Sequence, residues 1–280
     1  MKCFYHNDLD GRCAGAIVYK AMKNQENDGT GFSYIEIDYK DNINICSILK
    51  NEQIVIVDFS FKPEIMEEVL KKTKNIIWID HHKTADEYKY SQDIRGLRIT
   101  ENKKFSGCEL TWMYFYPKEN MPRAVELIGD RDKWAWKLGE ETANFNQGLL
   151  SQYHQPDSNI WDNLFTNSEV FLTAIKKEGE TCIRFRNSFC KDYADSYGFE
   201  TDFEGYKCFA LGLYMFGSEA FGERFKQYDI SLSYEYLGDK WIVGLYSEKI
   251  DVGEIAKRYG GGGHIGASGF VCKNLPFKGV

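Results

Sequence analysis

The chain has 280 residues, of which 43% are hydrophobic, 15% are aromatic and 28% are charged. This composition is ordinary for a globular protein and excludes a disordered chain, and the length suffices for one large domain or two modest ones. The formal net charge of −7 disfavours binding to long duplex nucleic acid, which usually needs a basic face, and favours short or small anionic substrates.

The N-terminus and the cysteines predict a cytoplasmic protein. Residues 1–6 contain no apolar signal sequence, and no run approaches the ~18–20 apolar residues that a membrane-spanning helix needs. The eight cysteines form no Cys-x-x-Cys pair, so we expect them to be reduced and to serve mainly as small buried apolar residues. We therefore expect no contact with a membrane.

Short β-rich runs alternate with amphipathic helices in the N-terminal half. Strands are expected at 2–5, 32–37, 53–57 and 75–79, and helices at 12–23, 62–73, 106–116 and 121–130. Strands that alternate with helices pair in parallel and give an α/β layered fold. Ser106 and Glu109 form a capping box at the start of one of these helices.

The C-terminal half has a different pattern. Residues 139–167 predict an irregular connector, and 168–197 predict a long, mostly polar helix. A smaller α+β domain follows, with a strand at 207–213, a helix at 218–227, a hairpin over 229–246, a capped helix over 251–259 and a strand at 268–272. The predicted organisation is an α/β domain over 1–150, a connector and linker helix over 151–197, and a substrate-binding domain over 198–280.

Polar side chains that can bind metal follow the first strand, in the segment His6-Asn7-Asp8-Leu9-Asp10-Gly11. Residues two apart in an extended segment point to one side, so His6, Asp8 and Asp10 are expected to converge. A metal ion would offset the repulsion between the two carboxylates. The alternative is a turn whose carboxylates cap the N-terminus of the following helix.

Further candidate ligands follow two later strands. Asp58 and Asp80-His81-His82 each end a strongly apolar strand, and in parallel sheets ligands bind at that edge. Asp130 follows another apolar segment and could complete the set, or it could belong to a helix end with a solvated ion pair. Mixed carboxylate and imidazole ligands suit Mn²⁺ or Mg²⁺, and their number suits two ions that share a carboxylate.

These motifs together resemble the DHH phosphoesterase superfamily. The shared elements are the His-x-Asp-x-Asp-Gly opening, an Asp after a later core strand, the Asp-His-His signature and a later Gly-x-x-Asp type of acid. The segment from Gly260 to Gly269 (Gly-Gly-Gly-Gly-His-Ile-Gly-Ala-Ser-Gly) resembles the signature of the DHH-associated domain, which accompanies the DHH domain in nanoRNases, RecJ-like exonucleases and cyclic-dinucleotide phosphodiesterases. The resemblance involves both ends of the chain.

The resemblance implies a role for each matching residue. One ion, most readily Mn²⁺ and otherwise Mg²⁺, would be held by His6, Asp8 and Asp58, and the other by Asp10, Asp58, His81 and Asp130. His82 would orient a ligand or donate a proton, Asp80 would fix a histidine tautomer, and Arg131 would reach the phosphate. Substrate contacts are expected from Gly261, Gly262, Gly263, His264 and Arg258, although the glycine run could also be a flexible loop with Gly260 as a helix cap.

The resemblance implies an active site in the cleft between the two domains, where an activated hydroxide cleaves short oligoribonucleotides to mononucleotides. A linear or cyclic dinucleotide, pyrophosphate or another small phosphoester is an alternative substrate. The alternative from another class is a catalytically silent nucleotide- or RNA-binding protein. The chain is expected to act on short single strands as a monomer or homodimer.

Overall fold

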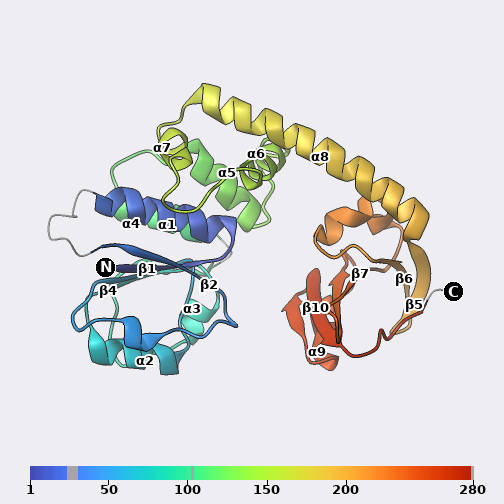
Figure 1. Cartoon of the computed structure of the whole chain (residues 1–280), viewed down its shortest axis with the longest axis horizontal. Helices are drawn as coiled ribbons and strands as arrows, with labels where there is room; N and C mark the ends of the chain where they lie inside the picture. Colours follow the sequence, from blue (N-terminus) through green and yellow to red (C-terminus); the bar gives the residue numbers. More distant parts are fainter. Residues whose placement is uncertain (24–30, 102–103, 279–280) are drawn as a thin grey trace. The chain divides into compact units, whose positions relative to one another are not determined.

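The computed structural model describes residues 1–23, 31–101 and 104–278 of the chain (Figure 1). They form two compact units, Met1–Cys182 and Ile183–Val280. The division falls inside helix α8 (Glu169–Tyr197). The bounds of α8 confirm the long helix predicted over 168–197. Among the described helices, none combines the length and apolar character that crossing a membrane requires.

The first unit contains a four-stranded sheet in which every neighbouring pair of strands is parallel. The strand order is β2-β1-β3-β4. The strands are β1 (Lys2–His6), β2 (Ser33–Ile37), β3 (Ile54–Val57) and β4 (Ile76–Ile79). Strands β3 and β4 are buried along their whole length, as the apolar runs in the sequence predicted for strands covered on both faces.

Helices cover both faces of this sheet, because alternate residues of each strand point to opposite sides. Val55, Val57 and Ile77 belong to the core beneath α1 (Leu9–Met22) and α4 (Gly107–Phe115). The intervening residues Ile54, Ile56 and Ile76 pack with residues of α2 (Pro63–Lys72) on the other face. A short helix, α3 (Thr84–Glu87), and a short 3-10 turn, η2 (Ile45–Ser47), complete this α/β sandwich.

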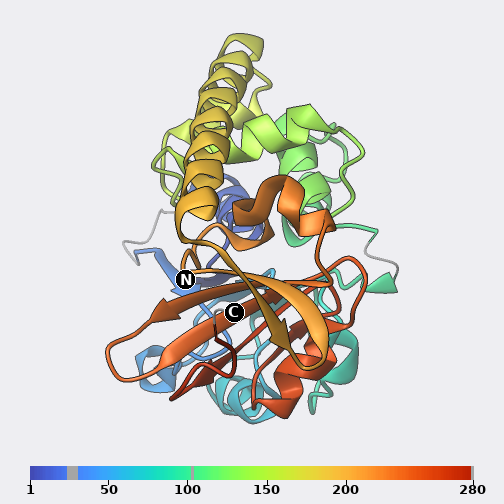
Figure 2. The ribbon, with the colours of Figure 1, turned by 90° about the vertical axis from the view of Figure 1, so that its right-hand side faces the viewer.

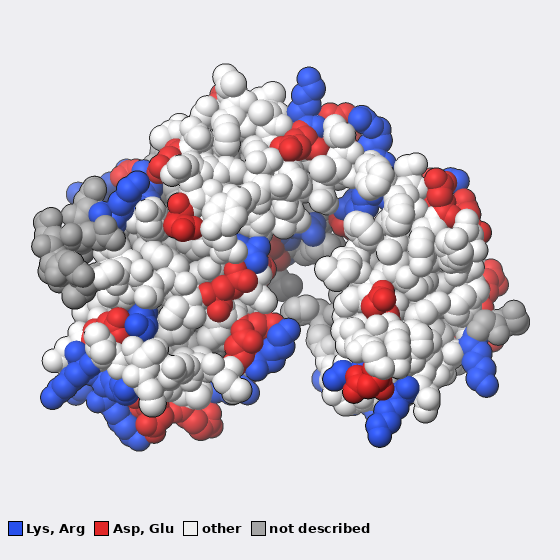
Figure 3. Space-filling view, in the orientation of Figure 1, with Lys and Arg blue, Asp and Glu red and all other residues white. Residues whose placement is uncertain are grey.

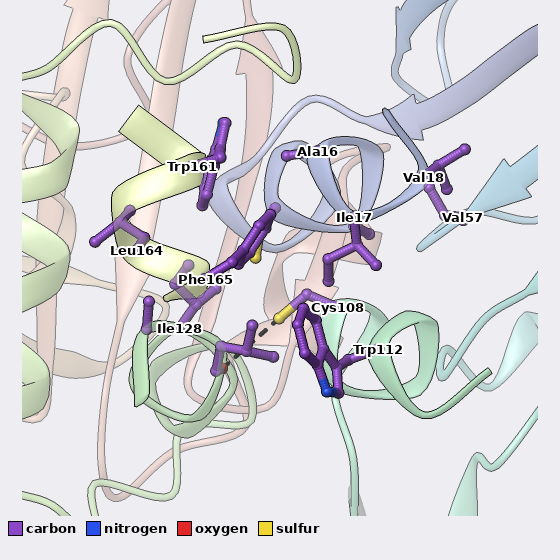
Figure 4. Close-up of a cluster of buried hydrophobic side chains, with 14 of the residues drawn as sticks. Ala16, Ile17, Val18, Val57, Cys108, Trp112, Ile128, Trp161, Leu164 and Phe165 are labelled. Carbon is purple, nitrogen blue, oxygen red and sulfur yellow. Dashed lines mark hydrogen bonds between the residues drawn. The ribbon is translucent and has the colours of Figure 1, made fainter. Parts of the chain in front are cut away.

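Three further helices extend the core of the first unit, namely α5 (Arg123–Asp132), α6 (Glu140–Leu150) and α7 (Ile160–Phe165). Figure 4 shows Trp161 and Phe165 from α7 in the same cluster as Ile17 of α1 and Trp112 of α4, and the Phe165 ring centroid lies 5.6 Å from those of Trp112 and Trp161. The irregular connector predicted over 139–167 is therefore wrong in part. The polar residues that suggested it have internal partners: the buried Asn146 amide donates to the Leu127 carbonyl at 2.8 Å.

The second unit contains a mixed six-stranded sheet of order β5-β6-β7-β8-β10-β9 (Figure 2). Its strands are β5 (Phe199–Phe203), β6 (Tyr206–Leu211), β7 (Ile230–Tyr236), β8 (Trp241–Tyr246), β9 (Gly262–His264) and β10 (Ala267–Cys272). Only β6 and β7 pair in parallel among these described strands. A 3-10 segment, η4 (Gly217–Lys226), and helix α9 (Val252–Arg258) accompany the sheet. The predicted α+β character is confirmed.

Helices α6 and α8 touch through their backbones at two glycines. A Cβ atom on Gly148 would lie 2.0 Å from the carbonyl oxygen of Ile175, and one on Gly179 would lie 1.7 Å from that of Asn144. Both distances are far below van der Waals contact. Glycine is therefore required at the crossing, although it lowers the helix propensity of each segment.

We expect the substitution Gly148→Ala to lower the free energy of unfolding by about 1–3 kcal/mol, because the added methyl group forces the two helices apart. The substitution Thr173→Ala, at an exposed position of α8, is the control and should change it by less than about 0.5 kcal/mol. Urea unfolding measures both values. A Gly148→Ala variant as stable as the wild type would contradict the close crossing.

Candidate metal centre

Acidic and histidine side chains converge at the carboxyl-terminal edge of the parallel sheet. His6 ends β1, Asp58 directly follows β3, and Asp80 directly follows β4. Parallel neighbours bring these three strand ends to the same edge. The end of helix α5 adds Asp132 from outside the sheet.

The side chains form three overlapping groups whose potential ligand atoms lie within 4.8 Å of one another. They are His6–Asp8–Asp58, Asp58–His81–His82 and Asp10–His81–Asp132. Asp58 and His81 each belong to two groups. The Nε2 atom of His81 lies 3.2 Å from Asp58 Oδ1 and 3.5 Å from Asp132 Oδ2. This overlap suits two ions that share ligands better than one isolated ion.

Four buried atoms at the centre of the cluster find no hydrogen-bond partner among the described residues. They are both carboxylate oxygens of Asp58, His81 Nε2 and Asp132 Oδ2. Burying polar atoms unpaired is costly, and such groups are normally hydrogen-bonded or coordinate a metal. The donor set of carboxylate oxygens and imidazole nitrogens fits Mn²⁺ or Mg²⁺.

The electrostatics of the cluster also favour a cation. Burial, together with the charges of Asp10 and Asp8, raises the pKa of Asp58 well above its usual range. The same causes raise the pKa of Asp132. Burial lowers the pKa of His81, which favours the neutral ring that a metal ion requires. A divalent cation would stabilise the charged carboxylates that the protein alone disfavours.

Asp8 and Asp10 each combine a helix contact with a place in the cluster. Asp8 is the N-cap of α1: its Oδ1 accepts from the Gly11 amide at 2.9 Å, while Oδ2 faces His6 Nδ1 at 2.7 Å. Asp10 accepts from Ser106 Oγ and from the first amides of α4. Metal binding and helix capping, which the sequence left as alternatives, are therefore compatible in this geometry.

Asp80 lies behind His82 rather than in the ligand groups. Its Oδ1 accepts from the His82 Nδ1–H at 2.8 Å and from the His81 and His82 amides, and Ser60 Oγ donates to the other oxygen. Burial disfavours the charged imidazole of His82, but the bond to Asp80 and nearby carboxylates outweigh it and raise the pKa of His82 to about 9. The ring is thereby fixed with Nε2 directed away from Asp80.

The structure does not bring Asp130 into the ligand groups. Its carboxylate accepts from the Lys137 amide at 2.9 Å, the Leu138 amide at 3.1 Å and Thr142 Oγ1 at 2.5 Å. Asp132, which the sequence analysis did not name as a candidate ligand, lies beside His81 instead. The helical period does not separate the two acids, because Asp130 lies three residues after the buried Leu127 and Asp132 lies four residues after the buried Ile128.

Tight backbone geometry fixes Asp58. Its φ is +55°, in the left-handed region that side chains rarely adopt. A Cβ on Gly107 would lie 2.5 Å from both Cβ and Oδ1 of Asp58, so only glycine at the start of α4 leaves room for this carboxylate. Strained conformations of this kind concentrate at functional sites.

The predicted substrate contacts of the C-terminal domain lie around the end of α9. The Gly260 amide donates to Lys257 O and the Gly261 amide to Ala256 O, which is a Schellman helix end with Gly260 at φ +76°. Gly262, Gly263 and His264 form the edge strand β9. Arg258 pairs with Glu204 at 3.0 Å. The helix cap at Gly260 is therefore confirmed, residues 262–264 form a strand, and anion binding by this segment stays a prediction.

We expect Gly107→Ala to weaken Mn²⁺ binding by at least about tenfold, because the new methyl group displaces Asp58, which two of the ligand groups share. Gly31→Ala is the matched control, since a Cβ at Gly31 would meet nothing within 4 Å. Calorimetric titration with Mn²⁺ measures both. Equal affinity in the two variants would show that Asp58 is not confined as described.

The two acids of α5 should separate metal binding from stability. Asp132→Asn should weaken Mn²⁺ binding, because it removes a charged ligand, with little effect on unfolding. Asp130→Asn should keep the Mn²⁺ affinity and lower the free energy of unfolding by about 1–3 kcal/mol, because it disrupts the hydrogen bonds that this buried carboxylate accepts. Titration with Mn²⁺ and urea unfolding test both variants, and the reverse pattern would restore Asp130 as the ligand.

Two curated relatives match most of the chain. It is 28% identical over 256 residues to uncharacterized protein R106 of Acanthamoeba polyphaga mimivirus, covering 83% of this chain and 57% of that protein. It is 24% identical over 307 residues to the bifunctional oligoribonuclease and PAP phosphatase NrnA of Mycoplasma genitalium, covering 97% of this chain and 88% of that protein. The chain thus spans little more than half the length of the first of these relatives.

Solved structures share the fold at low sequence identity. A DHH domain of PF0399, described as a member of the s1p family of ribosomal proteins, has a TM-score of 0.63 at 14% identity, covering 97% of this chain and 82% of that one. The pGpG-specific phosphodiesterase PggH of Vibrio cholerae has a TM-score of 0.56 at 14% identity, covering 97% and 93%. Exonuclease RecJ bound to manganese has a TM-score of 0.51 at 12% identity, covering 97% and 85%.

The sequence also matches a family description directly. Residues 3–129 match the DHH family, N-terminal domain. This range includes His6, Asp8, Asp10, Asp58 and His81, which the structure groups at the sheet edge. The match over this N-terminal part of the chain agrees with the resemblance of its motifs to the DHH phosphoesterase superfamily.

Proposed function

We propose that the chain is a metal-dependent phosphodiesterase that hydrolyses short oligoribonucleotides to mononucleotides. The observation that carries this proposal is the pair of buried, unpartnered Asp58 oxygens, which lie within the first two ligand groups of the cluster. A carboxylate in this position is suited to bridge two ions. Two-metal sites are a recurrent solution for in-line displacement at phosphorus.

Each part of the cluster has a role in this proposal. His6 and Asp8 would hold one ion, and Asp10, His81 and Asp132 the other. When bound, the ions would activate water and stabilise the charge that develops on the phosphoryl group. Asp132 replaces Asp130 in this assignment because of its contact with His81.

His82 would act as a proton donor near the leaving oxygen. Asp80 accepts from its Nδ1–H at 2.8 Å, so the Nε2 edge is the one available to a ligand or a substrate. The carboxylate fixes the ring orientation and stabilises its protonated form, as expected of a partner that orients a catalytic imidazole. Asp80 is thus a positioning residue in this proposal.

The charge distribution supports a short substrate. The formal net charge is −7, and Figure 3 shows cationic and anionic residues scattered over the described surface in view, without a continuous basic groove. Binding a long strand usually depends on such a groove. The relatives named for oligoribonuclease and pGpG phosphodiesterase activity support a substrate of a few nucleotides.

The C-terminal unit would supply the remaining contacts to the substrate. We assign them to Gly261, Gly262, Gly263, His264 and Arg258, with Arg131 from the first unit. The edge position of β9 in its sheet leaves one side of its backbone outside the sheet pairing. Edge strands of this kind can bind ligands through their main chain.

A linear or cyclic dinucleotide is the second candidate substrate, favoured by the fold shared with PggH. A small phosphoester or pyrophosphate would need the metal cluster alone. A catalytically silent RNA-binding protein could dispense with the ligands, yet the described cluster retains a competent side chain at each position of the three groups. This completeness favours an enzyme.

The test is hydrolysis of a dinucleotide, a pentanucleotide, a much longer RNA, a cyclic dinucleotide and pyrophosphate, in Mn²⁺, in Mg²⁺ and with chelator. We expect mononucleotides from the two short RNAs in Mn²⁺ and none with chelator. Asp58→Asn should lower the rate by at least about a thousandfold, because it removes the shared ligand.

Asp239→Asn is the matched control, since Asp239 is exposed in the turn between β7 and β8, and it should retain the wild-type rate. Turnover confined to the cyclic dinucleotide or to pyrophosphate would replace the proposed substrate with that compound. No turnover of any substrate by a protein with bound Mn²⁺ would overturn the enzymatic proposal.

A further inference from the structure

Two tryptophans directly after the metal centre adopt a rare backbone conformation. Trp134 and Trp136 lie between α5 and α6 with φ angles of +55° and +52°. A positive φ is an outlier for a bulky side chain and persists only where the surrounding structure enforces it. Such outliers cluster at functional sites, so the segment 133–139 calls for a functional explanation.

Asp130 holds this segment in place. Its carboxylate accepts from the amides of Lys137 and Leu138 and from Thr142 Oγ1, and its carbonyl accepts from the Ala135 amide at 2.9 Å. The Trp134 amide donates to the Arg131 carbonyl at 2.8 Å. Asp130, which the sequence analysis assigned as a metal ligand, therefore organises the segment that carries the two tryptophans.

The side chains form a compact aromatic and cationic surface. The two indole rings lie 5.2 Å apart at 79°, and the Arg131 guanidinium carbon lies 5.6 Å from each ring centroid. Trp134 is nevertheless 58% exposed, although burial of so large an apolar ring is favourable. An exposed indole on a backbone that hydrogen bonds hold in place is suited to bind a flat ligand.

The backbone of Trp134 lies close to the candidate metal centre. Asp132 belongs to the ligand group with Asp10 and His81, and Trp134 is only two residues further along the chain. Two residues span at most roughly 7 Å, a separation that one nucleotide can bridge from phosphate to base. Both features belong to the first unit, so their proximity follows from the chain itself.

We propose that Trp134, supported by Trp136 and Arg131, is a stacking surface for the base of the nucleotide whose phosphate lies at the metal centre. This inference rests on the proposed function and narrows its substrate class to phosphoesters that carry an aromatic base. Indole faces stack on any base, so the surface contributes affinity without sequence preference. Arg131 adds a positive charge beside an acidic cluster, which suits the substrate's anionic backbone.

The kinetic test compares wild type, Trp134→Ala, Trp134→Phe and Tyr153→Ala on an RNA dinucleotide and on its abasic analogue. Tyr153 is the matched control, because this aromatic residue is 68% exposed in the same unit. Trp134→Ala should lower kcat/KM on the dinucleotide roughly 10-fold to 100-fold, mainly through KM. Trp134→Phe should recover most of it, and Tyr153→Ala should match the wild type. All four proteins should cleave the abasic analogue equally.

A binding measurement keeps the inference separate from the proposed activity. Adenosine 5′-monophosphate in Mn²⁺ should quench the intrinsic fluorescence of wild type more than that of Trp134→Phe, whether or not the protein turns over RNA. Equal quenching, or an equal loss of Trp134→Ala activity on both dinucleotides, would overturn the stacking role. Absence of turnover by wild type, with quenching that depends on Trp134, would overturn the proposed hydrolysis alone.

Discussion

The structure of the first unit depends on a buried carboxylate that the protein alone leaves uncompensated. Asp58 is fully buried at the centre of the sheet edge, with no donor to either oxygen among the described residues. Neighbouring carboxylates make its charge still more costly. A bound divalent cation would remove both penalties. The need for such a cation explains why acids, imidazoles and a glycine converge at this edge of the sheet.

The surrounding helices position the acidic residues of the cluster as well as packing against the core. Gly107 at the start of α4 leaves the space that Asp58 occupies, and the first amides of α4 bind Asp10. Asp8 caps α1 on one oxygen and faces His6 with the other. Folding and ligand positioning therefore use the same hydrogen bonds at Asp8 and Asp10, and a change at either residue is expected to affect both.

Local patterns were sufficient to predict much of this arrangement. Apolar strands that end in Asp58 and Asp80 indicated a parallel sheet with its functional edge, and the capping box at Ser106 is present as expected. The sequence could not show which of two nearby acids reaches His81, because both Asp130 and Asp132 follow the same apolar segment. Their roles depend on tertiary contacts with Thr142 and His81. Helix α6 was not predicted because its polar residues find partners only in the folded protein, as the Asn146 amide does at the Leu127 carbonyl.

The most direct test of this account is a crystal structure of the protein in Mn²⁺ with anomalous diffraction at the manganese edge. We expect two anomalous peaks about 4 Å apart, both in contact with Asp58, with Asp132 bound to one of them and Asp130 still bonded to the segment that follows α5. A single peak would contradict the two-ion account. No peak at Asp58, with its carboxylate satisfied by protein donors, would contradict the metal centre itself.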